Sequence, residues 1–211
     1  MKVLLVNGSP HRNGCTNRAL EEISKEFEKL GIDSEIFWIG RKPVGGCMAC
    51  NQCAKIHRCA VDDVVNQSRE KFREADGFVF GSPVHYSGMA GSITGFMDRL
   101  FFSEQLGGDG KTFYLKPVAA VISARRSGTT AAFEQMNQYF TMLEMPIIST
   151  RYWNNVHGRS VEDVEQDLEG LMNMRILARN MAWFLKCKEA GEKSGVELPE
   201  IEPHVFTNFI R

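Results

Sequence analysis

Residues 1–17 read MKVLLVNGSPHRNGCTN, an apolar run that leads into a loop rich in glycine, serine and asparagine. The unbroken apolar run at residues 3–6 is typical of a parallel strand that is buried on both faces. Apolar residues then recur at helical spacing over residues 20–30, and Gly31 is a suitable helix stop. This stretch therefore predicts a strand, a loop and a helix in succession, which is the repeating unit of an α/β protein.

The same alternation continues along the chain. We expect further strands at residues 34–39, 77–81, 118–122 and 146–149, and helices at 65–75, 93–101, 133–143 and 161 to about 190. Five strands that alternate with helices predict a doubly wound, five-stranded parallel sheet with helices on both faces. Such a sheet binds ligands beyond the carboxyl ends of its strands, where the strand order reverses.

Length and charge indicate the class of protein. The 211 residues suit one domain over 1–211, in which 40–61 form a cysteine-rich loop and 190–211 an extended tail. A net charge of −1 gives no attraction to nucleic acid or anionic lipid. The first apolar run is too short for a signal peptide, and no run approaches the ~18–20 apolar residues of a membrane span. We therefore expect a cytoplasmic protein that binds neither nucleic acid nor membranes, and whose cysteines are reduced thiols or metal ligands rather than disulfides.

The loop after the first strand, Gly-Ser-Pro-His-Arg-Asn-Gly-Cys-Thr-Asn at residues 8–17, suits a phosphate. Free amide groups and the helix dipole favour an anion at the start of the helix that follows. The side chains that would add donors are Ser9, Arg12, Thr16 and Asn17. Cys15 stands where a P-loop requires lysine, and the dinucleotide fingerprint G-x-G-x-x-G is absent. The alternative is that Thr16 or Asn17 simply caps the helix.

The loops after the third and fourth predicted strands carry further candidates. Residues 81–88 read Gly-Ser-Pro-Val-His-Tyr-Ser-Gly, in which Tyr86 could pack beside an aromatic ring or could lie in a plain surface turn. Residues 123–128 read Ser-Ala-Arg-Arg-Ser-Gly, and Arg125 and Arg126 could bind a phosphate or be solvated loop charges. Both loops are expected at the ligand-binding edge of the sheet.

Together these three loops resemble the flavodoxin-like NAD(P)H-dependent FMN reductase family. The resemblance covers roughly residues 1–150, and residues 134–158 and 207–211 are also similar to a branch of flavodoxin-family oxidoreductases. It implies a flavodoxin-like fold, a homodimer or homotetramer, and an FMN whose phosphate is bound by the first loop. The residues that it implies for the phosphate are Ser9, Arg12, Thr16 and Asn17. Those implied for the isoalloxazine are Pro83, Val84, His85 and Tyr86, and those for its far side are Ser123, Ala124, Arg126 and Gly128.

Four cysteines, Cys47, Cys50, Cys53 and Cys59, have the spacing C-x2-C-x2-C-x5-C. The bacterial [4Fe–4S] pattern has a shorter last gap and a proline after it, where this chain has Ala60. Zinc prefers two separated C-x2-C pairs. The segment resembles that of iron–sulfur flavoproteins, so it is either a [4Fe–4S] site or a structural loop beside the flavin. The departures from the bacterial pattern favour the structural loop.

The resemblance implies an oxidoreductase that passes electrons from NAD(P)H through FMN to a quinone, a second flavin or another small acceptor. Because the cofactor supplies the chemistry, we expect no catalytic side chain. An alternative is an electron-transfer flavoprotein, with or without a cluster, that a protein partner reduces. Apolar residues on several sides of the last predicted helix indicate self-association: Met174, Leu177, Met181, Trp183, Phe184 and Leu185.

Overall fold

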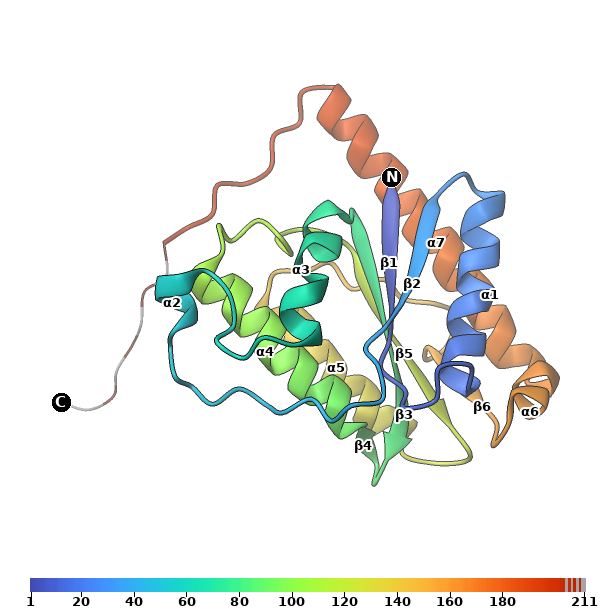
Figure 1. Cartoon of the computed structure of the whole chain (residues 1–211). Coiled ribbons are helices and arrows are strands. Elements are labelled where there is room, and N and C mark those ends of the chain that lie inside the picture. Colours follow the sequence, from blue (N-terminus) through green and yellow to red (C-terminus); the bar gives the residue numbers. More distant parts are fainter. Residues whose placement is uncertain (204, 206, 208, 210–211) are drawn as a thin grey trace.

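The computed structural model describes residues 1–203 together with 205, 207 and 209. Its main sheet contains five parallel strands in the order β2 (Asp33–Trp38), β1 (Lys2–Asn7), β3 (Gly77–His85), β5 (Val118–Ala124) and β6 (Asn155–His157) (Figure 1). A sixth, short strand, β4 (Gly88–Met89), pairs antiparallel with β3. The predicted α/β class and the parallel sheet are confirmed, with one strand more than expected.

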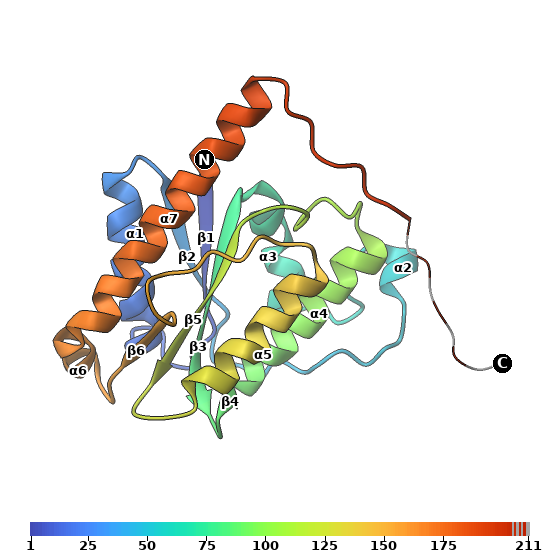
Figure 2. The ribbon, with the colours of Figure 1, turned by 180° about the vertical axis from the view of Figure 1, so that it is seen from behind.

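Helices cover both faces of this sheet, as the front and back views show (Figures 1 and 2). On one face lie α1 (Cys15–Lys29), α6 (Val161–Gln166) and α7 (Leu168–Lys193). On the other face lie α3 (Val64–Glu74), α4 (Gly91–Gly107) and α5 (Thr129–Met142). A single short helix, α2 (Cys53–Ile56), interrupts the cysteine-rich segment.

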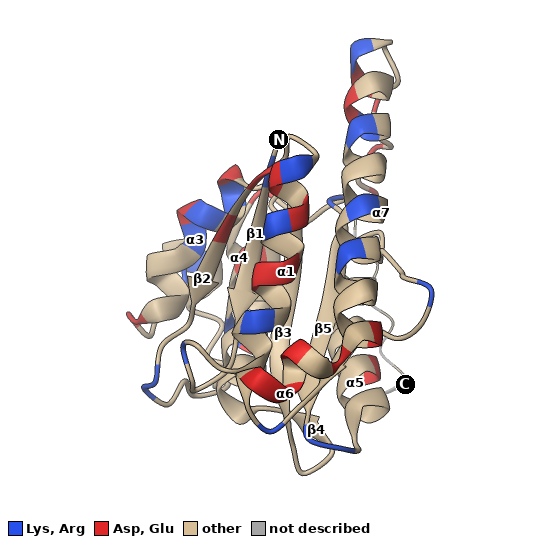
Figure 3. Ribbon diagram, turned by 90° about the vertical axis from the view of Figure 1, so that its right-hand side faces the viewer, with Lys and Arg blue, Asp and Glu red and all other residues tan. Residues whose placement is uncertain are grey.

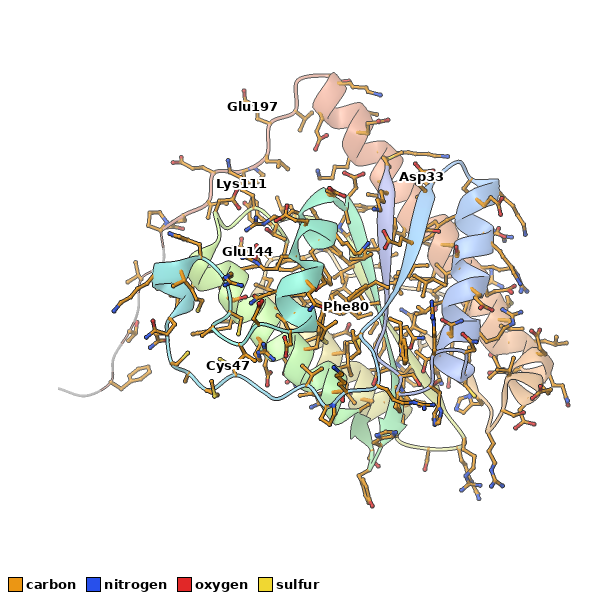
Figure 4. The ribbon with its side chains drawn as sticks, viewed as in Figure 1. Asp33, Cys47, Phe80, Lys111, Glu144 and Glu197 are labelled. Carbon is orange, nitrogen blue, oxygen red and sulfur yellow. The ribbon has the colours of Figure 1, made fainter. Side chains whose placement is uncertain are left out.

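The first strand shows why its apolar run is unbroken. Val3 and Leu5 point into the core on the α1 and α7 side, whereas Leu4 and Val6 point into the core on the α3, α4 and α5 side. All four side chains are fully buried. Phe80 of β3 likewise fills the layer between the sheet and α4, as the stick view shows (Figure 4). A strand between two helical layers needs apolar side chains on both faces.

The position predicted for the last strand is wrong. Residues 146–149 form only one isolated bridge, between Ile147 and Val118, and the chain joins the sheet as β6 instead. Ile148 is apolar because it packs in the core on the α7 side. Three other strands are longer than predicted, since β1 spans Lys2–Asn7, β3 continues to His85 and β5 to Ala124.

The predicted single helix from residue 161 to about 190 is two helices. Asp167 separates them: one carboxylate oxygen accepts the backbone amide of Gly170, and the other accepts that of His157. These bonds cap α7 and attach its start to β6. The helix then runs to Lys193, so the extended tail begins later than residue 190. Residues 204, 206, 208, 210 and 211 of that tail, with part of the family resemblance at 207–211, lie outside the described residues.

Most of the apolar side chains of α7 are buried against other elements of the same molecule. Met174, Leu177, Met181 and Leu185 are buried against α1 and the sheet, while Trp183 stays 68% exposed. Figure 3 marks basic residues along α7 and acidic residues on α1. Arg175 pairs there with Glu22, and Arg179 with Glu26. Self-association therefore remains a prediction that rests on a smaller exposed apolar surface. No helix among the described residues is long and apolar enough to span a membrane.

Candidate functional site

The strand order reverses between β1 and β3, and an open pocket lies at their carboxyl ends. In a parallel sheet the chain leaves such a point in opposite directions, which creates a crevice for a ligand. The pocket has a volume of about 480 Å³. Its lining consists of Ser9, His11, Asn13, Gly14, Cys15, Thr16, Pro83, Val84, Ser123, Ala124, Arg125, Gly158, Arg159, Ser160 and Val161.

The helix α1 points its N-terminus at this pocket. Gly14 is the N-cap residue and provides no side-chain cap, so the first amide groups of the helix stay available to a ligand. Arg125 and Arg159 add positive charge to the lining, which contains no Asp or Glu among the described residues. Free amides, the helix dipole and two guanidinium groups together favour a phosphate.

The loop between β1 and α1 is held from inside by the fully buried Asn7. Its Oδ1 accepts the backbone amide of Ser9 at 3.0 Å, and its Nδ2 donates to the carbonyl of Arg12 at 3.0 Å. Gly8 brings the loop against β3, because its amide donates to the carbonyl of Gly81 at 2.9 Å. These hydrogen bonds hold the loop to the ends of β1 and β3.

The predicted phosphate residues fall into two groups. Ser9 and Thr16 line the pocket, and the Thr16 hydroxyl shares a 2.8 Å hydrogen bond with that of Ser123. Asn17 is buried outside the lining, where it donates to Glu21 and accepts from Asn7. Arg12 is exposed outside the lining, with its guanidinium 5.8 Å from the centre of the Trp38 ring.

The residues predicted for the isoalloxazine are also divided. Pro83 and Val84 line the pocket at the end of β3. His85 and Tyr86 do not: His85 pairs with Gly88 in the hairpin of β3 and β4, and Tyr86 is fully exposed at its tip. The predicted loop at 81–88 is thus mostly strand and hairpin. Both tip residues have positive φ, as a two-residue hairpin turn requires.

The residues predicted for the far side of the ring follow the same pattern. Ser123 and Ala124 end β5 and line the pocket. Gly128 does not line it but caps α5 with φ +92, where a side chain would collide with Val84. Arg126 is exposed outside the lining, and its neighbour Arg125 lines the pocket instead.

One wall of the pocket was not predicted. The wall is formed by residues that follow β6 directly, next to the end of β5: Gly158, Arg159, Ser160 and Val161. The sequence feature that could have identified these residues is their position directly after the last strand. The prediction did not include them because it placed that strand at 146–149. His11, Asn13 and Cys15 also line the pocket beyond the predicted set. Burial, with Asp163 and Glu162 nearby, raises the pKa of the Cys15 thiol, which keeps it neutral.

The cysteine-rich segment lies along α4 (Figure 4), and its cysteines line a second pocket that shares no residue with the first. Two helix glycines permit the close contact, because a side chain at Gly95 or Gly107 would strike backbone atoms of Val44 or Cys53. The four cysteines of the C-x2-C-x2-C-x5-C segment line one narrow pocket: Cys47, Cys50, Cys53 and Cys59. Tertiary packing therefore gathers all four side chains around one small space.

A buried arginine lies beside these cysteines. Arg99 donates to the Cys59 sulfur at 3.2 Å, and Asp63 holds the same guanidinium through two hydrogen bonds. Burial raises the pKa of the Cys53 thiol, and Cys47 and Cys50 raise it further. In the arrangement of the described residues, no three Cys, His, Asp or Glu side chains converge closely enough to hold a metal ion.

Comparisons with known proteins show the family to which this chain belongs. The family model described as NADPH-dependent FMN reductase matches residues 1–159. An iron-sulfur flavoprotein of Methanocaldococcus jannaschii is 26% identical over 198 residues, which cover 88% of this chain and 98% of the relative. An iron-sulfur flavoprotein of Archaeoglobus fulgidus is 25% identical, with coverage of 87% and 97%.

Solved structures support the fold. RosB with a bound 8-demethyl-8-formylriboflavin-5′-phosphate intermediate superimposes with a TM-score of 0.69 at 18% identity, covering 100% of this chain and 94% of RosB. A flavodoxin from the domain Archaea gives 0.56 at 19% identity, with coverage of 88% and 99%. The family match includes every residue of the pocket lining except Ser160 and Val161. This chain therefore belongs to the NADPH-dependent FMN reductase family and is an FMN-binding oxidoreductase with a flavodoxin-like fold.

Proposed function

We propose that the chain oxidises NAD(P)H and passes the electrons through FMN to a small acceptor such as a quinone or a second flavin. The single observation that supports this most is the pocket at the strand ends, where the uncapped start of α1 faces residues from β3, β5 and the segment after β6. The pocket combines free helix amides and arginine side chains, which suit a phosphate, with an opening to solvent. Such an opening suits a ring that must meet a donor and an acceptor in turn.

The protein's part in this function is binding and orientation. The start of α1, with Ser9 and Thr16, would hold the phosphate, while Pro83, Val84 and Ala124 would contact the ring. Bound FMN supplies the hydride and electron chemistry. Cys15 is the one thiol that lines the pocket among the described residues, and its raised pKa leaves it a poor nucleophile. We therefore keep the proposal that no side chain acts as a catalytic acid, base or nucleophile.

The test is anaerobic reduction of the FMN-loaded protein by NADPH or NADH alone, followed by flavin absorbance. We expect the absorbance of the oxidised flavin to disappear after the nucleotide is mixed in. The absorbance should return when a quinone is added. The control is free FMN at the same concentration, which measures the uncatalysed reaction. A flavin that neither nucleotide reduces, but that a reduced protein carrier does, would refute the proposal in favour of electron transfer from a protein partner.

A second candidate function is electron relay through an iron–sulfur cluster. The observation in its favour is the common pocket of the four cysteines, and relatives that cover almost their whole length are named iron-sulfur flavoproteins. Thiolates are the ligands that such clusters require. The thiols would have to move together to bind one, because no three converge in the described residues. The alternative is that the segment binds no cluster and is a structural loop. The departure of the cysteine spacing from the bacterial [4Fe–4S] pattern favours this alternative.

Iron and sulfide analysis of protein purified without oxygen decides between these outcomes. A [4Fe–4S] cluster requires about four irons per chain and adds broad absorbance near the flavin bands. Substitution by Ser of Cys47, Cys50, Cys53 or Cys59, one at a time, should then remove the iron. Cys187→Ser is the matched control, since this exposed cysteine lies on α7. Iron-free parent protein, with FMN and NAD(P)H oxidation retained in all four variants, would support the structural loop.

A further inference from the structure

Trp38 lies at the end of β2, next to the loop that faces the pocket. Its backbone pairs with Asn7, the last residue of β1, and its side chain is half-buried. The indole Nε1 donates to the carbonyl of Ser9 at 2.7 Å, across 29 residues of sequence. A hydrogen bond this short between distant segments fixes the loop relative to the sheet edge.

The same indole ring also faces Arg12. The guanidinium carbon lies 5.8 Å from the ring centre, within the range of a cation–π interaction. The backbone of Arg12 is held separately, because its carbonyl accepts from Asn7. Trp38 therefore restrains the loop at two points on its outer side, whereas Asn7 restrains it from within.

These contacts matter because a free arginine side chain and a mobile loop both lose conformational freedom when they bind an anion. A loop that is already ordered binds its ligand more tightly, since less entropy is lost on binding. Riboflavin lacks the phosphate, so the order of this loop contributes nothing to its binding.

We propose that Trp38 is a positioning residue that sets the preference of the pocket for phosphorylated flavin over riboflavin. It holds the carbonyl of Ser9, which lines the pocket, and the guanidinium of Arg12, which lies outside the lining but on the same loop. This inference rests on the proposed placement of the FMN phosphate at the loop between β1 and α1.

The experiment compares FMN and riboflavin affinity, by titration calorimetry, in the full-length protein and its Trp38 variants. Trp38→Leu removes both contacts and should weaken FMN binding about tenfold, the combined size of a hydrogen bond and a cation–π contact. Trp38→Phe keeps a ring for Arg12 but loses the indole N–H, and should weaken FMN binding about threefold. Riboflavin affinity should change by less than about twofold in both variants, because the loop makes no phosphate contact with it.

Two further measurements separate positioning from general stability. In an Arg12→Ala background, Trp38→Phe and Trp38→Leu should have the same effect, because the ring then has no guanidinium to hold. Amide hydrogen exchange of residues 8–14 in the flavin-free protein should be faster in Trp38→Leu than in the parent. Trp183→Leu is the matched control: this tryptophan is 68% exposed on α7, and its loss should change neither affinity.

The outcomes are distinct. Equal weakening of FMN and riboflavin would show that Trp38 only stabilises the fold and would overturn the inference, as would FMN affinity unchanged in Trp38→Leu. If the parent binds riboflavin as tightly as FMN, the placement of the phosphate at this loop and the role of Trp38 both fail, whereas the NAD(P)H reduction experiment tests the oxidoreductase function separately. If the parent prefers FMN and Trp38→Leu keeps that preference, only the role of Trp38 fails.

Discussion

The close approach of the first loop to β3 gives the sharpest prediction for this protein. In Gly8→Ala, the new Cβ would lie 2.6 Å from the Cβ of Ile93 and 2.8 Å from the carbonyl oxygen of Gly81. Ordinary contacts begin near 3.4 Å, so the loop must move outward by several tenths of an ångström. The Gly81 carbonyl cannot turn aside, because it belongs to β3 and accepts the amide of residue 8.

We therefore expect Gly8→Ala to lower the free energy of unfolding by about 1–3 kcal/mol, the usual cost of overpacking a dense core. The displacement also moves the start of α1 relative to the rest of the pocket, so FMN affinity should fall with it. Urea unfolding of the flavin-free protein measures the first effect, and calorimetric titration measures the second. The matched control is Gly91→Ala at the start of α4, where an added Cβ meets nothing within 4 Å.

Gly91→Ala should change the free energy of unfolding by less than about 0.5 kcal/mol, as surface substitutions usually do. The reasoning would be refuted if Gly8→Ala matched this control in stability and in FMN affinity. It would be refuted in part if stability fell but FMN affinity did not, since the position of the loop would then be unimportant for the ligand.

Three other predictions concern the phosphate, acid stability and assembly. Arg12→Ala and Thr16→Ala should each weaken FMN binding by ~1–3 kcal/mol, as for the loss of a bond to a charged group; riboflavin titration, which should give parent-like affinity, is the control. Hydrogen bonds from Lys29 and Arg179 hold the pKa of Glu26 below its ordinary value of 4.5, so the ion pairs stabilise the fold above that pH and are lost as pH falls below it. The urea concentration at the unfolding midpoint should therefore fall less steeply at acid pH in Glu26→Gln than in the parent. An identical pH dependence in the two proteins would contradict this. We expect a dimer or tetramer, so light scattering that gives 23.8 kDa at all concentrations would exclude self-association.

The sequence by itself determined the class of fold and the end of the sheet at which the pocket lies. Residues 3–6 are apolar at every position, which a strand between two helical layers requires and which local pattern alone reveals. The glycine- and serine-rich loop that follows had to lie at the start of a helix, and the structure places it there. Ser9 and Thr16 line the pocket for this reason.

Only the tertiary structure decided which side chains share the pocket and which bond elsewhere. Asn17 matches the family pattern in sequence, yet its amide is taken up by Glu21 and Asn7. Tyr86 follows a predicted strand, yet the pairing of β3 with β4 turns it out to solvent. The wall at 158–161 depends on β6, whose three residues join the sheet through long-range pairing with β5. Local periodicity records which face of an element is buried, but it contains no information about which distant segment supplies the partner, so these contacts exist only in the folded chain.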